Sequence, residues 1–225
     1  MHTPPPFRAD EASREAWLVR TNPFGILVST VNGTPVATHL PMLRRHPHPD
    51  GPPDDRQALL GSTIVGHMAR ANGHWRSIAP GQQVLAVFSG PDGYVSPTLY
   101  RTNSAAPTWN YAAVHITGAI RIIDDSDESL AVIRSTIELT EADAAQPWNP
   151  EPSMHYINSI LTGITAFEIT VTNVQSIFKL SQDKDTTIQR RVRDFFAGSR
   201  HGRHQDLAEL MADTATTTVS RQVPD

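Results

Sequence analysis

Apolar and polar residues alternate with the two-residue period of a β-strand in many parts of the chain. Two such runs, 24–31 and 34–40, are joined by Asn32-Gly33, a pair that favours a two-residue type I′ turn because both positions tolerate positive φ. The sequence therefore predicts a β-hairpin here. Further strands are predicted over 59–65, 83–89, 94–96, 109–123, 164–171 and 176–180, with a turn at 91–93.

Helices are expected before and between these strands. Asp10 is placed to cap a helix that ends at Asn22-Pro23, and Asp125 with Glu128 is placed to open another. Two more are expected over 69–78 and 152–161, whereas the Pro- and Asp-rich segment 46–55 is expected to be an exposed loop. Short strands with helices among them predict a mainly β or α+β fold with a closed sheet, although periodicity does not select among barrels.

The C-terminal region changes character. Apolar residues recur at i, i+4, i+7 and i+8 and predict an amphipathic helix over 184–199: Ile188, Val192, Phe195 and Phe196. From 179 to 204 there are seven basic and three acidic residues, a local charge of +4 in a chain of net charge −4. The helix is expected either to dock with a solvated basic face or to contact nucleic acid through Arg190, Arg191 and Arg193. The polar, Thr-rich segment 200–225 is expected to be disordered.

Composition sets the class of protein. With 225 residues and 39% hydrophobic residues, the chain can bury a core. No apolar run reaches the roughly 18 residues that span a bilayer, and residues 1–6 do not resemble a secretory signal, so a cytoplasmic protein without membrane contact is expected. The absence of cysteine excludes disulfides, thiolate metal sites and thiol catalysis. The net negative charge argues against a globally basic nucleic-acid-binding surface.

Several kinds of catalytic site find no support. The histidine pairs His46/His48 and His201/His204 lack a matched carboxylate, so no metal site is expected. Neither the G-x-S-x-G elbow nor the G-x-x-x-x-G-K-[ST] phosphate loop occurs. Acidic residues cluster at 54–55 and 124–128, as is typical of loops and helix starts, so no catalytic pair is assigned.

Five fragments place polar side chains where a strand ends or a helix is expected to start, positions from which a fold can present donors to a phosphate and a planar ring. They are PVATHLP at 35–41, GHMARAN at 66–72, YVSP at 94–97, PTWNYAAVH at 107–115 and FKLSQ at 178–182. In order and spacing they resemble the PaiB-type family of FMN-binding proteins, often described as negative transcriptional regulators. The resemblance covers about 3–185. The chain departs from the family at Leu99, where an aromatic residue is usual, at Gly73, where a proline is usual, and in the longer loop 46–55.

The resemblance implies a split β-barrel related to pyridoxamine phosphate oxidases, with peripheral helices. It also implies a homodimer that holds FMN at the subunit interface. On this basis the expected organisation is a split-barrel FMN-binding domain over 1–183, the basic helix 184–199 and the tail 200–225.

Within the FMN-binding family, Arg70 is the first candidate for the phosphate, because a guanidinium offers a bidentate fork and the helix expected at 69–78 adds positive potential. Thr38 and His39 are adjacent in a strand and face opposite sides, so only one is expected to face the flavin. Within the fragment 107–115, Asn110 is expected to be the most important residue for binding the flavin, because its amide can pair with the polar rim of the ring. For His67, a purely structural role as a hydrogen-bonded histidine packed against the barrel is as well supported as a contact with the flavin. Trp109 has an alternative role as a core or interface anchor. The further cofactor-binding candidates are Ala69, Asn72, Tyr111, Lys179, Ser181 and Gln182.

The resemblance leads to one preferred function and two alternatives. The preferred one is a homodimeric, FMN-binding negative transcriptional regulator that responds to flavin or redox state and acts through DNA or a regulatory protein. The first alternative is an FMN-dependent oxidoreductase acting on a small acceptor. The second, a haem-binding or haem-degrading split-barrel relative, rests only on the fold and on ten histidines.

Overall fold

The computed structural model describes residues 1–9, 11–45, 58–102, 104–142 and 144–220. The predicted loop 46–55 and the predicted cap Asp10 lie outside these residues. The chain divides into two compact units. Unit 1 comprises Met1–Asp10, Ser89–Ala113 and Ser176–Asp225, and unit 2 comprises Glu11–Phe88 and Val114–Gln175.

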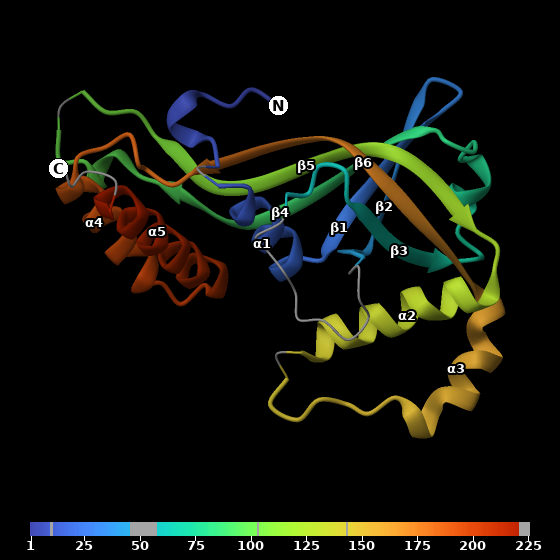
Figure 1. The fold of residues 1–225 in the computed structure, drawn as a ribbon. Helices are drawn as coiled ribbons and strands as arrows, with labels where there is room; N and C mark the ends of the chain where they lie inside the picture. The colour runs from blue at the N-terminus through green and yellow to red at the C-terminus, as the bar shows by residue number, and fades with distance from the viewer. Residues whose placement is uncertain (10, 46–57, 103, 143, 221–225) are drawn as a thin grey trace. The chain divides into compact units, whose positions relative to one another are not determined.

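Six strands follow one another in the order β1-β2-β3-β6-β5-β4 and close into a barrel (Figure 1). They are β1 (Phe24–Val31), β2 (Thr34–Arg44), β3 (Thr63–Ala69), β4 (Gln83–Val95), β5 (Thr108–Ile123) and β6 (Ile164–Lys179). The helices are α1 (Ala12–Thr21), α2 (Ser126–Glu141), α3 (Met154–Ile160), α4 (Thr186–Ala197) and α5 (Gly202–Ser220). Short 3₁₀ turns are η1 (Pro5–Phe7), η2 (Gly73–Ser77), η3 (Pro97–Leu99), η4 (Glu151–Ser153) and η5 (Leu161–Gly163). The mixed α+β fold with a closed antiparallel sheet confirms the predicted fold class.

The predicted hairpin is confirmed. β1 pairs antiparallel with β2 up to Val31 opposite Thr34, and the turn residues Asn32 and Gly33 have φ of 49° and 80°. Both values are positive, as a type I′ turn requires. β1 also pairs with β4, and β2 pairs with β3, so the hairpin lies inside the sheet.

Helix α2 covers one face of the sheet in unit 2 (Figure 1). Its first turn is capped by Asp125, whose side chain accepts a hydrogen bond from the Glu128 backbone N–H at 2.8 Å. This cap confirms the predicted helix start. The cluster that α2 forms with the strands consists of Leu43, Val65, Ile123, Val132 and Ala166, with Leu139 packed against it.

Two predicted strand breaks are wrong. Residues 91–93 do not form a turn but continue β4, and β6 runs without interruption through 172–175. At Gly93 an added Cβ would lie 2.5 Å from the ring of Phe196 and 3.1 Å from Leu207. The glycine therefore permits close packing against α4 and α5 in unit 1, a tertiary contact that overrides the local preference for a turn.

The predicted helix 69–78 is also wrong. β3 extends to Ala69, the Asn72 backbone N–H donates to the Ala69 carbonyl at 2.8 Å, and only the 3₁₀ turn η2 follows. The side chain of Asn72 accepts the His74 backbone N–H at 3.0 Å and caps that turn. Gly73 at its start disfavours a longer helix.

Helix α4 confirms the predicted amphipathic segment, with Val192 and Phe196 buried. The predicted disorder of 200–225 is wrong for its described part, because α5 occupies Gly202–Ser220. Four apolar side chains of α5 are buried within unit 1, namely Leu207, Ala208, Leu210 and Met211. Their packing stabilises a helix that the Thr-rich composition obscures. In the part of the chain that the structure describes, no helix has the length and apolarity to cross a membrane.

Candidate functional site

Arg70 lies directly after β3 and is anchored to the start of β6. Its backbone N–H donates to the Gly163 carbonyl at 2.8 Å, and its Nε donates to the Ile164 carbonyl at 3.2 Å. The residue is exposed. No carboxylate of the described residues forms an ion pair with the Arg70 guanidinium. Arg70 is thus an exposed arginine whose backbone N–H and Nε are anchored to neighbouring carbonyls.

A second guanidinium joins Arg70 at Trp75. The Arg70 Cζ lies 5.4 Å and the Arg76 Cζ 4.9 Å from the centre of the Trp75 ring, both within cation–π range. The indole Nε1 donates to the Arg70 carbonyl at 2.9 Å, which fixes the ring. Arg70, Trp75 and Arg76 are here called the Arg70–Arg76 cluster. Two guanidiniums without a described carboxylate suit an anion with more than one negative charge.

The expected source of positive potential near Arg70 is therefore corrected. The sequence placed Arg70 in the first turn of a helix, whereas the nearest helical segment is the short η2, which begins at Gly73. Arg76, rather than helix amides, supplies the additional positive charge. Sequence reasoning missed Trp75 and Arg76, although they follow the GHMARAN fragment within four residues of its end.

A buried histidine that the sequence analysis did not select organises the region beside the cluster. His74 is 4% exposed, and its Nε2 and Nδ1 each lie 2.8 Å from a hydroxyl, Ser29 Oγ and Thr38 Oγ1 respectively. Asn72 Nδ2 also donates to Thr38 Oγ1, at 3.3 Å. Burial lowers the pKa of His74, so the neutral imidazole is favoured. Thr38 and Asn72, two predicted cofactor residues, thus make their hydrogen bonds within this network.

Thr38 and His39 face opposite sides of β2, as predicted. Thr38 points to His74, whereas the His39 ring stacks on Phe24 with the ring centres 6.3 Å apart. His39 is exposed, and Phe24 is 69% exposed.

His67 holds a polar atom without a partner. In β3 it pairs with Ala166 of β6, and its Nδ1 is buried without a hydrogen bond among the described residues. Burial lowers the pKa of His67. Its neighbour Gly66 permits close strand packing, because an added Cβ would lie 2.7 Å from Phe167 and 2.9 Å from the Pro41 carbonyl oxygen. Ala69, also predicted at the cofactor, contributes its carbonyl to the turn before η2.

The remaining predicted cofactor residues belong to unit 1. Asn110 is fully buried, and its Nδ2 donates to Ser181 Oγ at 2.9 Å. Lys179 Nζ donates to Thr108 Oγ1. A cavity of about 430 Å³ is bordered by Thr108 and by these three predicted residues: Asn110, Lys179 and Ser181.

Three other predicted residues of unit 1 have different surroundings. Trp109 is 53% exposed and meets Tyr94 edge to face, with ring centres 6.1 Å apart. Tyr111 is half-buried. Gln182 makes two local bonds, accepting from the Leu180 N–H and donating to the Phe178 carbonyl, and so stabilises its own turn.

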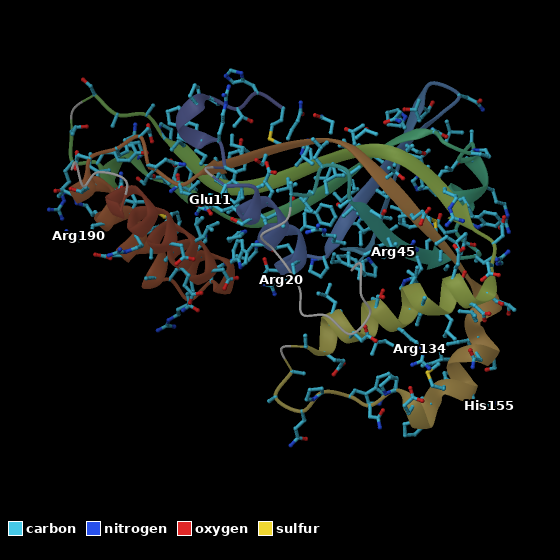
Figure 2. All side chains as sticks on the ribbon, viewed as in Figure 1. Glu11, Arg20, Arg45, Arg134, His155 and Arg190 are labelled. Carbon is cyan, nitrogen blue, oxygen red and sulfur yellow. The ribbon has the colours of Figure 1, made fainter. Side chains whose placement is uncertain are left out.

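The candidate nucleic-acid residues on α4 differ from one another. Arg191 donates to the Leu99 carbonyl and is half-buried, and Arg193 pairs with Asp194 at 3.3 Å. Arg190 is exposed (Figure 2). Over the described ranges, no three His, Asp or Glu side chains gather as metal ligands.

Comparisons with known proteins agree with this fold. A family model described as "Putative FMN-binding domain" matches residues 1–173. The chain is 33% identical over 216 residues to "Protease synthase and sporulation protein PAI 2" of Bacillus subtilis, covering 95% of this chain and 97% of that one.

Solved structures show the same fold at low identity. The FAD and heme binding protein from Mycobacterium smegmatis superposes with a TM-score of 0.54 at 15% identity, over 85% of this chain and 80% of that chain. The flavocytochrome Anf3 from Azotobacter vinelandii gives a TM-score of 0.50 at 12% identity, over 76% and 67% of the two chains. The predicted resemblance to PaiB and the predicted flavin cofactor are thereby confirmed, and the chain belongs to the FMN-binding domain family that includes PAI 2.

Proposed function

We propose that this protein binds FMN with the phosphate held at the Arg70–Arg76 cluster, and that it acts as a homodimeric negative transcriptional regulator responsive to flavin or redox state. One observation carries the phosphate assignment: two guanidiniums gather on one fixed indole ring, and no described carboxylate neutralises them.

The residues present fit FMN. Its phosphate carries nearly two negative charges at neutral pH, which two guanidiniums match in number and which Arg can bind bidentately. Arg70 is held by its backbone and by Nε, so binding would order few additional torsions. Among the described residues His67 Nδ1 has no hydrogen-bond partner, and a polar ligand atom could provide one, as acceptor or donor according to the tautomer. The Thr38–Asn72–His74 network holds β2 and η2 in place beside the cluster rather than offering free donors.

When bound, FMN supplies a ring that accepts a hydride or electrons, so the protein's task is to bind and orient it. Homodimer formation is supported by the exposed Phe24–His39 stack of unit 2 and the exposed Tyr94–Trp109 pair of unit 1, aromatic surfaces that a second copy would cover. A regulatory role is supported by the name of the Bacillus subtilis relative, which refers to protease synthase and sporulation.

A titration of apoprotein followed by flavin fluorescence tests the phosphate assignment. FMN and riboflavin are compared on the wild type, Arg70→Ala and Arg76→Ala. The matched control is Arg134→Ala, an arginine of α2 in the same unit that pairs with Glu151 (Figure 2).

Loss of one charge-assisted contact should weaken FMN binding about tenfold in each cluster variant and leave riboflavin binding unchanged. The control should bind both ligands like the wild type. Equal weakening of FMN and riboflavin, or no weakening in either cluster variant, would contradict the assignment.

A further inference from the structure

The sequence contains only two lysines among its 19 basic residues, and both line the same cavity of unit 1. We propose that this cavity binds a small hydrophilic molecule through its phosphate group, at a site separate from the flavin. The proposal goes beyond the proposed function and does not depend on it.

The cavity has a volume of about 430 Å³ and a lining that mixes polar and apolar side chains. Five lining residues carry a hydroxyl group, which can donate a hydrogen bond to a phosphate oxygen. The hydroxyl-bearing lining residues are Tyr100, Thr102, Ser104, Thr108 and Ser181.

Of the two lysines, Lys184 is paired with a carboxylate, whereas Lys179 is not paired with any described carboxylate. Lys184 Nζ pairs with Asp183 Oδ2 at 2.8 Å and lies 5.7 Å from the centre of the Tyr100 ring. Lys179 donates to the Thr108 hydroxyl and lies 5.8 Å from the centre of the Phe7 ring. No described carboxylate pairs with Lys179. The three charged lining residues therefore leave one positive charge at Lys179 for an anion.

Two lining residues, Asn110 and Ser181, are hydrogen-bonded to each other, and the backbone at and beside the lining is strained. Asn110 and Ser181 exchange hydrogen bonds of 2.9 and 3.1 Å, and Asn110 Nδ2 also approaches Met211 Sδ at 3.6 Å. Ser181 has φ of 64°, a left-handed conformation that non-glycine residues rarely adopt. Arg101, next to the lining residues Tyr100 and Thr102, has φ of 55°. Strained residues of this kind cluster at ligand sites.

The lining favours a small ligand over a flavin. Its apolar members are Ala105, Ala106, Pro107 and Ile188, and the buried Tyr100 ring already lies near a lysine ammonium. A flavin ring requires a broad apolar or aromatic surface, which these side chains do not provide. Lys179 and Ser181, predicted from sequence at the flavin, are assigned here to a different ligand.

The two lysines also provide the probe. Reductive methylation with ¹³C-formaldehyde labels Lys179, Lys184 and the N-terminal amine while keeping their charge. Lys184→Met and Lys179→Met assign the signals. Inorganic phosphate is then titrated at constant ionic strength against chloride, with acetate as a carboxylate probe.

Phosphate should shift both lysine signals with one saturable curve, and chloride and acetate should not. Lys179→Met should weaken the response of Lys184 about tenfold, and Lys179→Arg should largely restore it. Arg190→Gln, which removes a cation of α4 outside the lining, should behave like wild type. A linear response, an equal response to chloride or acetate, or binding unaffected by Lys179→Met would overturn the proposal.

Repeating the phosphate titration with saturating FMN tests whether the sites are separate. The lysine shifts should persist, and their loss would show that FMN occupies the cavity and would overturn a separate site. Flavin fluorescence is read in the same samples. If flavin fluorescence is quenched but phosphate does not shift the lysine signals even without FMN, only the phosphate site of the cavity is refuted. If phosphate shifts the lysine signals but flavin fluorescence is not quenched, only the proposed flavin site is refuted.

Discussion

Replacing His74 by alanine tests whether the buried histidine network stabilises unit 2. His74 joins Ser29 of β1 to Thr38 of β2 through two hydrogen bonds of 2.8 Å. Each bond contributes about 1 kcal/mol, and leaving the buried Ser29 hydroxyl without a partner costs about 1 kcal/mol more. The expected loss is therefore about 3 kcal/mol in the free energy of unfolding.

Urea denaturation measures this loss as a shift of the midpoint at constant m-value. His39→Ala, which removes an exposed histidine one residue from Thr38, is the matched control and should change stability by less than about 0.5 kcal/mol. If His74→Ala cost no more than His39→Ala, the network would not contribute to stability and the reasoning would be refuted.

The same residue predicts a pH dependence. Burial lowers the pKa of His74 below the ordinary histidine value of 6.5, so the unfolded chain binds a proton more readily than the folded one. The stability that His74 contributes is complete above 6.5 and decreases as the pH falls through the folded-state pKa. His67 shifts in the same direction and adds to the slope. His74→Gln should therefore flatten the slope below 6.5 only in part, and an unchanged slope would contradict the assignment.

Three further changes test other parts of the account. Gly66→Ala would place a methyl group 2.7 Å from a phenylalanine ring of β6, so unfolding measurements should show a loss of about 1 to 3 kcal/mol; a neutral result would contradict the tight packing. Glu168→Gln breaks the ion pairs of Glu168 with Arg121 at 2.7 Å and with Arg45 at 2.8 Å and should cost about 1 kcal/mol. Because ion pairing with Arg121 lowers the pKa of Glu168, this contribution should be lost as the pH falls below the ordinary glutamate value of 4.5, and an effect that persists in acid would refute it. If the proposed regulation acts through direct DNA contact, neutralising Arg190 and Arg193 should abolish salt-sensitive retardation of DNA by the protein; unchanged retardation would exclude α4 as the contact.

Local signals made much of the fold predictable. The hairpin follows from Asn32-Gly33, the start of α2 from Asp125 and Glu128, and α4 from its apolar stripe. In each case the residues that determine the element are neighbours in sequence.

The errors arose where distant contacts decide the structure. Residues 91–93 form strand because Gly93 packs against α4 and α5, and α5 is helical because its short apolar face is buried in unit 1. No periodicity in those segments reveals the partner.

The candidate site residues stay predictions, and the structure adds neighbours that sequence spacing did not indicate. Arg70 and Asn72 lie in the region that the GHMARAN fragment indicated. His74, Trp75 and Arg76 were missed because their roles depend on contacts with β1, β2 and the Arg70 backbone that sequence spacing does not show.

The most direct test of the central claim is the ³¹P NMR spectrum of FMN bound to the wild type and to the double variant Arg70→Ala/Arg76→Ala. On the wild type, the phosphate signal should be displaced from its free position and stay nearly constant through the pH range in which free FMN titrates, because two guanidiniums hold the dianion. On the double variant, flavin that remains bound should show a signal that returns towards the free position and titrates like it. A bound signal identical in both proteins would contradict the assignment of the phosphate to the Arg70–Arg76 cluster.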